Sequence, residues 1–490
     1  MTQGAMLRRG AAWMFAGRSV SQALTFAFGV VLARLLAPAD FGLLLTIQIY
    51  TGVAGLVSGG GMGQALVRAK SVGKADYDIV FTLQLAIGCA IYAAFFFVAP
   101  LLARWYDTPL YTDLIRVSAL NFLFRPLINL PTNILFREQR YRAMTVIGLV
   151  TLVATSAASI GLAWGGFGVW SLIWGGIAGA FVQAALQICH TRWRPGLCTG
   201  FARARELASY GFMVSANDIV DYLRQKLSIF MLSQNLGPAS VGLYNKGESL
   251  AQMPFTFFSG SAYQVLFRAM AGDQDNLDKC RYLFMQGVRL VAVYGTPFYV
   301  GLLWLAEPLI RGVYGTQWLE AARPLLVLSL AWPFLLLENM SGAVAAALNL
   351  LSSEVQIHSA NLLVSVLAIM IALPFGLVGV AWAMVGATVF SCVFLYRLAC
   401  AKLGLRWWHG LQALGPAALL NAVLGMALFA CAHALPADLK RHDLLHVGIT
   451  AAVGGVVYAA CLLLLPIPSL AGERRRWRKR IGLGVPALES

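Results

Sequence analysis

The chain has 490 residues, of which 59% are hydrophobic and 12% charged, and its formal net charge at pH 7 is +16. Soluble domains carry about 25% charged residues, so this composition excludes a soluble globular protein and indicates one embedded in a bilayer. Its 48 glycines lie largely within apolar runs, as is common where membrane helices approach closely. The basic residues form short clusters between these runs, which the positive-inside rule explains better than nucleic-acid binding does.

Motifs for catalysis or cofactor binding are absent from the sequence. Eight cysteines are scattered singly with no CxxC pair, so neither a disulfide framework nor a zinc site is predicted. There is no Walker A sequence, which excludes an ATPase within the chain. We therefore expect a transporter rather than an enzyme, with no cofactor and no bound metal.

The chain divides into apolar segments long enough to cross a membrane. A helix needs roughly 20 mostly apolar residues for this, and that rule gives about fourteen spans. The first is expected to be a retained helix rather than a signal peptide, because it is long and contains Arg18 and Gln22. The approximate cores are 12–35, 41–66, 78–103, 112–135, 142–164, 167–190, 206–235, 240–266, 282–305, 320–348, 355–375, 377–398, 411–435 and 445–466.

Basic clusters alternate along this predicted topology. An even number of spans puts both termini on one side, and the clusters that follow even-numbered spans fall on that same side. These clusters include the loop at 192–205 and the tail RRRWRKR at 474–480, and Arg8 and Arg9 before the first span lie on the same side. Because cytoplasmic loops carry the excess of Lys and Arg, we predict a multi-pass inner-membrane protein with both termini in the cytoplasm.

One short sequence occurs twice. LAPADFGLL at 36–44 returns as LGPASVGLY at 236–244. Each copy ends an odd-numbered span, where proline and glycine favour a tight turn between antiparallel helices. A weaker pair, GFGVWSL at 166–172 and LVGVAWAM at 377–384, follows at a similar offset. The spans therefore look like two parallel six-helix copies, a duplication that recurs in secondary transporters.

The predicted fold is an all-α polytopic membrane protein in four parts. Residues 1–200 form an N-terminal lobe of helices 1–6, and 201–403 form a C-terminal lobe of helices 7–12. Residues 404–466 add helices 13 and 14 outside the repeat, and 467–490 are a basic cytoplasmic tail.

Two spans of the N-terminal lobe carry polar side chains. In the first, Arg18 and Gln22 lie one helical turn apart and share a face. In the fourth, Asn121, Arg125 and Asn129 recur at steps of four and form a stripe. Such residues either make hydrogen bonds between helices or line a cavity. A cation between amides suits phosphate and sugar hydroxyls, so we predict that these residues bind substrate.

Carboxylates in later spans are candidates for coupling transport to an ion. A carboxylate in a low-dielectric cavity is able to take up and release a proton. Glu338 ranks first, because Asn339 follows it and no basic residue is near in sequence, and Glu248 ranks second. Asp218 and Asp221 have basic neighbours, which favour internal charge pairing instead.

Several of these stretches resemble a known family. They are LARLLAPADFGLLLTIQ at 32–48, GGGMGQALVRAK at 59–70, the segment 236–272 that begins LGPASVGLYNKGESLAQ, and VYGTQWLEAARPLLVLSLA at 313–331. Together they look like the polysaccharide-transport (Wzx/WzxC-like) branch of the multidrug/oligosaccharidyl-lipid/polysaccharide exporter superfamily. The resemblance implies two six-helix lobes that face a central cavity, with an extra helix pair. The chain departs from it at 224–237, which displaces Asp221 from the family's position.

The resemblance also implies a function. The leading hypothesis is a flippase for a polyprenyl-diphosphate-linked oligosaccharide in exopolysaccharide, capsule or O-antigen synthesis, working beside a polymerase and a chain-length regulator. Because no nucleotide site exists, an ion gradient would drive alternating access. The alternatives are a small-molecule multidrug antiporter of the same superfamily and, third, a polysaccharide polymerase or ligase.

The predicted topology is testable with reporter fusions. Fusions after residues 72, 196 and 400 should report the cytoplasm, because basic clusters surround them. Fusions after residues 108, 237 and 438 should report the opposite side. A consistent inversion across one half would contradict both the span count and the repeat.

Overall fold

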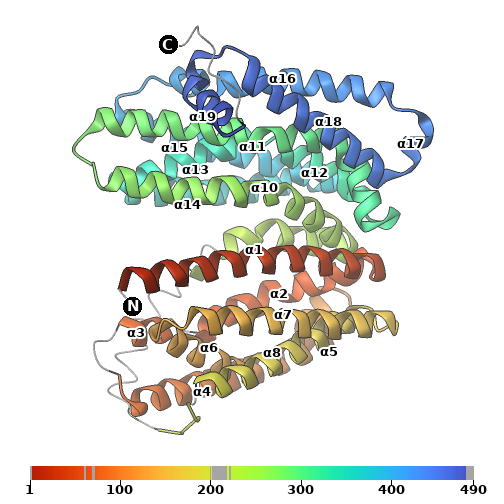
Figure 1. The fold of residues 1–490 in the computed structure, drawn as a ribbon. Helices are drawn as coiled ribbons and strands as arrows, with labels where there is room; N and C mark the ends of the chain where they lie inside the picture. Colours follow the sequence, from red (N-terminus) through yellow and green to blue (C-terminus); the bar gives the residue numbers. More distant parts are fainter. Residues whose placement is uncertain are drawn as a thin grey trace. The chain divides into compact units, whose positions relative to one another are not determined.

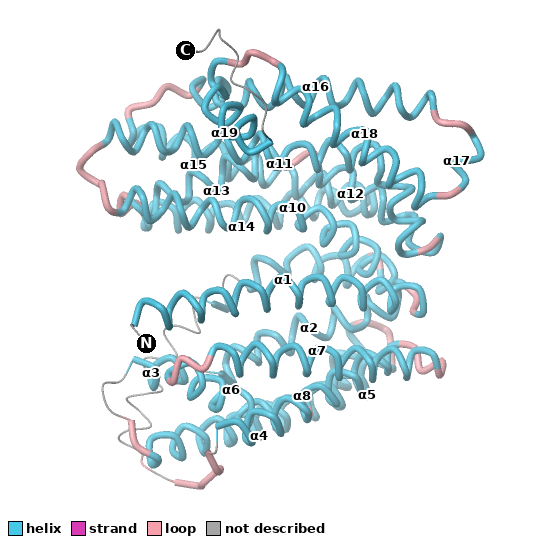
Figure 2. The backbone as a smooth tube through the Cα atoms, viewed as in Figure 1, coloured by secondary structure: helices cyan, strands magenta, loops and turns pink. Residues whose placement is uncertain are grey.

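The computed structural model describes residues 3–59, 62–68, 72–191, 193–198, 200, 218–219 and 222–481 (Figures 1 and 2). The described residues are helical except for short connections and contain no strand, which confirms the all-α prediction. They fall into two compact units, Met1–Gly242 and Leu243–Ser490. The predicted limits of the lobes at residues 200 and 403 stay predictions.

The first unit is a helical bundle. Its α7 packs along α8 and α1, α4 packs along α5 and α6, and α2 contacts α4, α5, α6 and α8. Residues 222–235 are also helical and belong to this unit. The helix bounds are α1 Gln3–Leu35, α2 Pro38–Gly59, α3 Met62–Arg68, α4 Lys74–Trp105, α5 Leu110–Ala119, α6 Asn121–Arg137, α7 Tyr141–Trp164 and α8 Val169–Thr191.

The second unit is built around α11. This long helix packs against α13, α16 and α18, while α15 packs against α13 and α14. The bounds are α10 Gly237–Ala271, which begins in the first unit, α11 Leu277–Tyr314, η1 Thr316–Ala321, α12 Ala322–Ser329, α13 Trp332–Ala347, α14 Leu351–Ala372, η2 Leu373–Phe375, α15 Gly376–Leu403, α16 Trp408–Ala434, α17 Ala437–Arg441, α18 Asp443–Leu464, η3 Pro468–Leu470 and α19 Ala471–Ile481.

Two expected continuous spans are broken. The segment 112–135 consists of α5 and α6, which meet at Leu120. The segment 320–348 bends by 52° between α12 and α13. There Pro333, in the first turn of α13, has no N–H to continue the hydrogen bonds of the preceding helix. Sequence reasoning missed both breaks because the rule for a membrane span weighs only length and overall apolarity.

Eight helical segments among the described residues are long and apolar enough to cross a membrane, or nine if the bent pair counts as one. One of the eight, Leu351–Leu403, contains both α14 and α15, which turn back at Gly376 and pack along each other. The chain is a multi-pass membrane protein, and the number fourteen stays a prediction.

The two copies of the repeated turn lie against each other. A Cβ atom added at Gly42 would collide with the carbonyl oxygen of Pro238, and one added at Gly242 would collide with the carbonyl oxygen of Pro38. The contact is therefore reciprocal, because the glycine of each copy lies against the proline carbonyl group of the other. Glycine is required at both positions because no side chain fits between these backbones.

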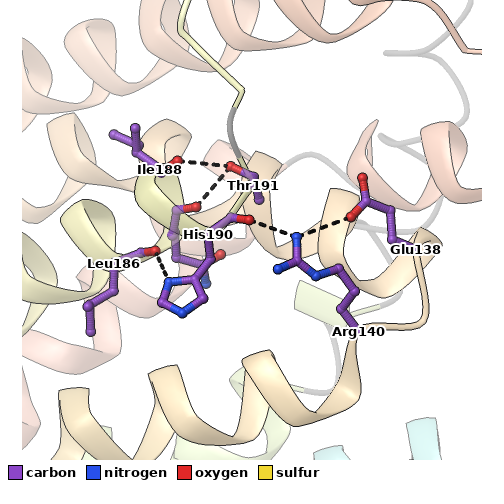
Figure 3. A network of polar contacts seen from close by, with 7 residues as sticks. Glu138, Arg140, Leu186, Ile188, His190 and Thr191 are labelled. Carbon is purple, nitrogen blue, oxygen red and sulfur yellow. Dashed lines mark hydrogen bonds and ion pairs between the residues drawn. The ribbon is translucent and has the colours of Figure 1, made fainter.

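The loops at one end of the first unit are held by Arg140. Its Nη1 donates to the carbonyl oxygen of His190 at 2.7 Å and lies 3.5 Å from Glu138 (Figure 3). Thr191 in turn donates to the carbonyl oxygen of Gln187 at 2.8 Å. Arg140 thus ties the α6–α7 turn to the end of α8 by a backbone contact.

The additional helices α16 and α18 are fastened to α11. Arg311 at the end of α11 donates from Nε to both carboxylate oxygens of Asp443, each at 2.9 Å, and from Nη2 to Oδ1 at 2.7 Å. Toward the other end, Tyr458 of α18 donates to the carbonyl oxygen of Val293 at 2.6 Å. These contacts hold α18 on α11, and α16 packs along both helices.

The reciprocal turn contact predicts that Gly42→Ala and Gly242→Ala each lower stability. Because the added methyl meets backbone rather than a flexible side chain, we expect a cost of about 1–3 kcal/mol and a lower Tm in detergent. Gly148→Ala in α7 is the matched control, since nothing lies within 4 Å of its added Cβ. An unchanged Tm in both turn variants would contradict the contact.

Candidate functional site

A polar cavity of about 630 Å³ lies within the first unit. Side chains of α1, α2, α5, α6, α7 and α8 line it, together with two from the helical segment 222–235. The polar groups at its wall are hydroxyls, amides and two cations, Arg125 and Lys226. This combination inside an apolar bundle marks it as the candidate site.

Arg125 is fixed by the backbone of α2. Its Nη1 donates to the carbonyl oxygen of Gly55 at 2.6 Å, and its guanidinium carbon lies 5.4 Å from the centre of the Phe122 ring. Within the described part of the chain, that carbonyl is its hydrogen-bond acceptor. An arginine has five N–H donors, so this hydrogen bond uses a small part of the donor capacity of Arg125, which lines the cavity.

A row of glycines on α2 and α3 makes this arrangement possible. A Cβ atom at Gly55 would collide with the guanidinium of Arg125, and one at Gly63 would collide with the amide of Asn133. Between them, Gly59 faces the amide nitrogen of Asn129, which lies 3.8 Å from its added Cβ. The polar stripe of α6 therefore packs into a groove made by missing side chains, and this groove sets the position of each polar group.

Tyr222 and Lys226 enter the same cavity from the segment 222–235. The hydroxyl of Tyr222 donates to the carbonyl oxygen of Gln48 at 2.6 Å, and its ring end occupies the space beside Gly52. Lys226 Nζ lies 5.9 Å from the centre of the Tyr222 ring. Sequence reasoning did not assign these two to the site. Their spacing by four residues, one helical turn, was the available signal.

The predicted α6 residues are placed on this stripe. Asn121 and Arg125 line the cavity, and Asn129 lies one turn further along α6. The amide of Asn121 also donates to the carbonyl oxygen of Ser118 at 3.2 Å, across the break between α5 and α6. Asn121 thus combines a cavity position with a structural hydrogen bond.

The predicted α1 residues lie elsewhere. Arg18 and Gln22 are exposed on α1 and are not among the residues that line the cavity. Of α1, Leu32 reaches the cavity wall. The structure of this unit therefore brings together Asn121 and Arg125 but not Arg18 and Gln22, and substrate contact by the latter two remains a proposal.

The coupling candidates are dispersed. Glu338 on α13 accepts a hydrogen bond from the hydroxyl of Ser391 on α15 at 2.6 Å. Glu248 is half-buried on α10, and Asp218 is exposed. Asp221 lies outside the described residues. The hydrogen bond of Glu338 therefore links α13 to α15.

The cavity is electrostatically one-sided. Arg125 and Lys226 contribute positive charge, and no carboxylate is found among the described side chains that line it. Half-buried cations without carboxylates favour an anion, and arginine in particular recognises phosphate through its fork of donors. Surrounding hydroxyls and amides such as Thr51, Ser118 and Asn121 suit sugar hydroxyls.

A second cavity, in the second unit, differs in chemistry. It has a volume of about 550 Å³ and lies between α11, α16, α18 and α19. Leucine, valine, alanine and glycine make up most of its wall. It offers little to a charged head group, so the candidate site for polar chemistry is the cavity of the first unit.

Comparison with known proteins identifies the family. The family model described as "Polysaccharide biosynthesis protein" matches residues 31–323, more than half of the chain. The chain belongs to this family. The matched range includes both repeated turns and all of the described cavity residues, so the resemblance seen in the sequence is confirmed.

Two proteins of similar sequence are named for polysaccharide biosynthesis. The succinoglycan biosynthesis transport protein ExoT of Rhizobium meliloti (strain 1021) is 23% identical over 69% of this chain and 66% of its own length. The lipopolysaccharide biosynthesis protein WzxC of Escherichia coli (strain K12) is 24% identical over 63% of this chain and 63% of its own. The chain thus spans slightly less than two thirds of each relative.

Solved structures show the same fold. A structure titled "Lipid II flippase MurJ, inward closed conformation" aligns with a TM-score of 0.73 at 15% identity, over 91% of this chain and 97% of that one. An inward-facing multidrug resistance transporter of the MATE family and MOP superfamily aligns with a TM-score of 0.62 at 15% identity, over 78% and 94%. The fold is therefore that of these membrane transporters.

Proposed function

We propose that the protein is a flippase that moves a polyprenyl-diphosphate-linked oligosaccharide across the inner membrane. The observation that carries the proposal is the cavity of the first unit, where Arg125 and Lys226 meet hydroxyls and amides without a described carboxylate. The names of ExoT and WzxC, and the fold shared with MurJ, support it. A transporter of cationic drugs would favour an acidic cavity, which the described lining does not provide.

The proposed mechanism separates the two parts of the cargo. The diphosphate and sugars carry charge and hydroxyls and need a polar route, whereas the polyprenyl tail stays in lipid. Arg125, held to α2 through the Gly55 carbonyl, presents its remaining donors to the diphosphate. Asn121, Asn129 and the cavity hydroxyls contact the sugars. Arg18 and Gln22 are proposed to contact the head group in another state of the transport cycle.

The proposed setting is surface-polysaccharide assembly. In the proposed orientation both termini lie in the cytoplasm. The head group is taken up on the cytoplasmic side, where glycosyltransferases build it, and is released on the outer side. A polymerase and a chain-length regulator would then use the product. This order follows from the chemistry, because the assembled head group must change leaflets before polymerisation outside the cell.

The proposal predicts that Arg125→Ala lowers polysaccharide export by roughly tenfold to 100-fold, the range for a hydrogen bond to a charged group. Arg125→Glu should abolish export, since it places two like charges together. Arg125→Lys should retain partial export, because the charge remains but the fork is lost. Export is measured in cells and compared with the amount of folded protein in the membrane.

Arg116→Ala is the control for these variants. Arg116 lies on α5 against the Phe96 ring and does not line the cavity. Normal export by Arg125→Glu would remove Arg125 from the substrate site. Equal losses in Arg116→Ala and Arg125→Ala would mean that both act through folding.

Ion coupling is proposed to run through carboxylates of later helices, with Glu338 first and Glu248 second. Asp218 and Asp221 are proposed to pair with neighbouring bases. A coupled ion must bind differently in the two states of the transporter, or it shifts nothing. Protonation of Glu338 would change the acceptor that Ser391 donates to, and so the contact between α13 and α15.

Reconstituted flipping tests this proposal. With an imposed proton or sodium gradient, Glu338→Gln should lose most of the gradient-dependent rate, and Glu248→Gln a smaller part. Glu320→Gln, at an exposed position of η1, is the control and should behave as the unsubstituted protein does. A gradient-dependent rate of flipping that is unchanged by both substitutions would contradict the assignment of these residues.

A further inference from the structure

The C-terminal helix α19 has two chemically different faces. The inner face carries Arg474, Trp477 and Arg478, each of which donates a hydrogen bond to the second unit. The outer face carries Arg475, Arg476, Lys479 and Arg480, all exposed. With 3.6 residues per turn, these four fall on one continuous side of the helix.

The inner face holds α19 firmly in place. Trp477 Nε1 donates to the hydroxyl of Tyr294 on α11 at 2.8 Å, and that hydroxyl donates to Glu473 at 3.0 Å. Arg474 is buried, and its Nη1 donates to the carbonyl oxygen of Leu465 at 2.6 Å. These hydrogen bonds hold α19 against the second unit, so the position of its basic outer face is fixed.

This helix lies at the level where a membrane surface is expected. It follows α18, a candidate span, with only η3 and its flanking residues between them. Leu464, at the end of α18, is 73% exposed, and Ile481, at the end of α19, is 58% exposed. Exposed apolar side chains on both sides of a basic face indicate contact with lipid.

The start of α16 gives independent evidence that the membrane surface lies at this end of the helices. Because α16 and α18 pack as an antiparallel pair, the beginning of α16 lies at the end where α18 finishes. There Trp407 is 64% exposed, and the Arg406 guanidinium carbon lies 5.1 Å from the centre of the Trp408 ring. Tryptophan with arginine is typical of the head-group region of a bilayer.

We propose that the outer face of α19 is a binding site for anionic phospholipid head groups. Phosphodiester groups complement these four basic side chains. The single acidic residue of α19, Glu473, accepts a hydrogen bond from the Tyr294 hydroxyl and also pairs with Arg476 at 2.9 Å, so the outer face as a whole keeps a positive charge. Basic clusters directly after a membrane helix are attracted to anionic lipid, by about fivefold in binding for each Lys or Arg. Bound lipid steadies the docked helix against α11 and α18.

The test uses the full chain, purified in neutral detergent. Native mass spectrometry measures the binding of phosphatidylglycerol and of phosphatidylcholine to the unsubstituted protein and to Lys479→Gln/Arg480→Gln. We expect a preference for phosphatidylglycerol that the double variant weakens about 25-fold, at fivefold for each charge. Raising the salt concentration should weaken the same preference, since exposed charges are screened.

Two matched variants make the outcome decisive. Lys479→Arg/Arg480→Lys keeps both charges and should bind as the unsubstituted protein does. Arg104→Gln/Arg323→Gln removes two exposed charges elsewhere and should also leave the preference intact. Equal binding of the two lipids, or an unchanged preference in Lys479→Gln/Arg480→Gln, overturns the proposal. An unchanged preference in this double variant is the result expected if α19 binds an acidic protein partner instead of lipid. Neither readout depends on transport, so the proposal stands or falls separately from flippase activity.

Discussion

The candidate site depends on one packing constraint, the absence of side chains along one edge of α2 and α3. Gly52, Gly55, Gly59 and Gly63 leave a groove into which Tyr222, Arg125, Asn129 and Asn133 fit. The groove also exposes a backbone carbonyl, and Gly55 uses its own to hold Arg125 at 2.6 Å. A buried cation is costly in a membrane unless it is paired. Here the pairing is partial, which anchors the guanidinium and still leaves donors for a ligand.

The same use of glycine recurs in the repeated turns. Gly42 and Gly242 face the carbonyl groups of Pro238 and Pro38. The two copies of the repeated turn motif therefore form a reciprocal contact. Within lipid the hydrophobic effect does not drive helices together. Van der Waals contact between closely approaching backbones holds them together instead. The second unit also uses side-chain hydrogen bonds and ion pairs, such as Arg311 with Asp443 and Trp477 with Tyr294.

Much of the fold could be predicted from the sequence, because membrane helices obey a simple rule of length and apolarity. The helices α4, α7, α8, α16 and α18 lie close to the expected spans. The breaks within 112–135 and 320–348 were missed, because a rule of length and overall apolarity does not register a break inside a span; Pro333 was the available signal for the second break. The α6 stripe was visible as a period of four, and Arg125 and Asn121 do line a cavity. The glycine groove opposite them was not visible, because it requires knowing which helix packs on α6. Tyr222 and Lys226 were missed for the same reason, as their cavity is formed by helices distant in sequence.

The most direct test asks whether the cavity of the first unit is open to water and selective for anions. In a cysteine-free background, Thr155→Cys places a thiol at the cavity wall, and Val153→Cys places one on an exposed apolar part of the same helix, away from the cavity. An anionic thiol reagent should label Thr155→Cys faster than a cationic reagent of equal size does, and Arg125→Glu should reverse that order. Val153→Cys should react slowly with both reagents. Labelling of Thr155→Cys that is no faster than that of Val153→Cys, or that is indifferent to the charge of the reagent, would contradict the account.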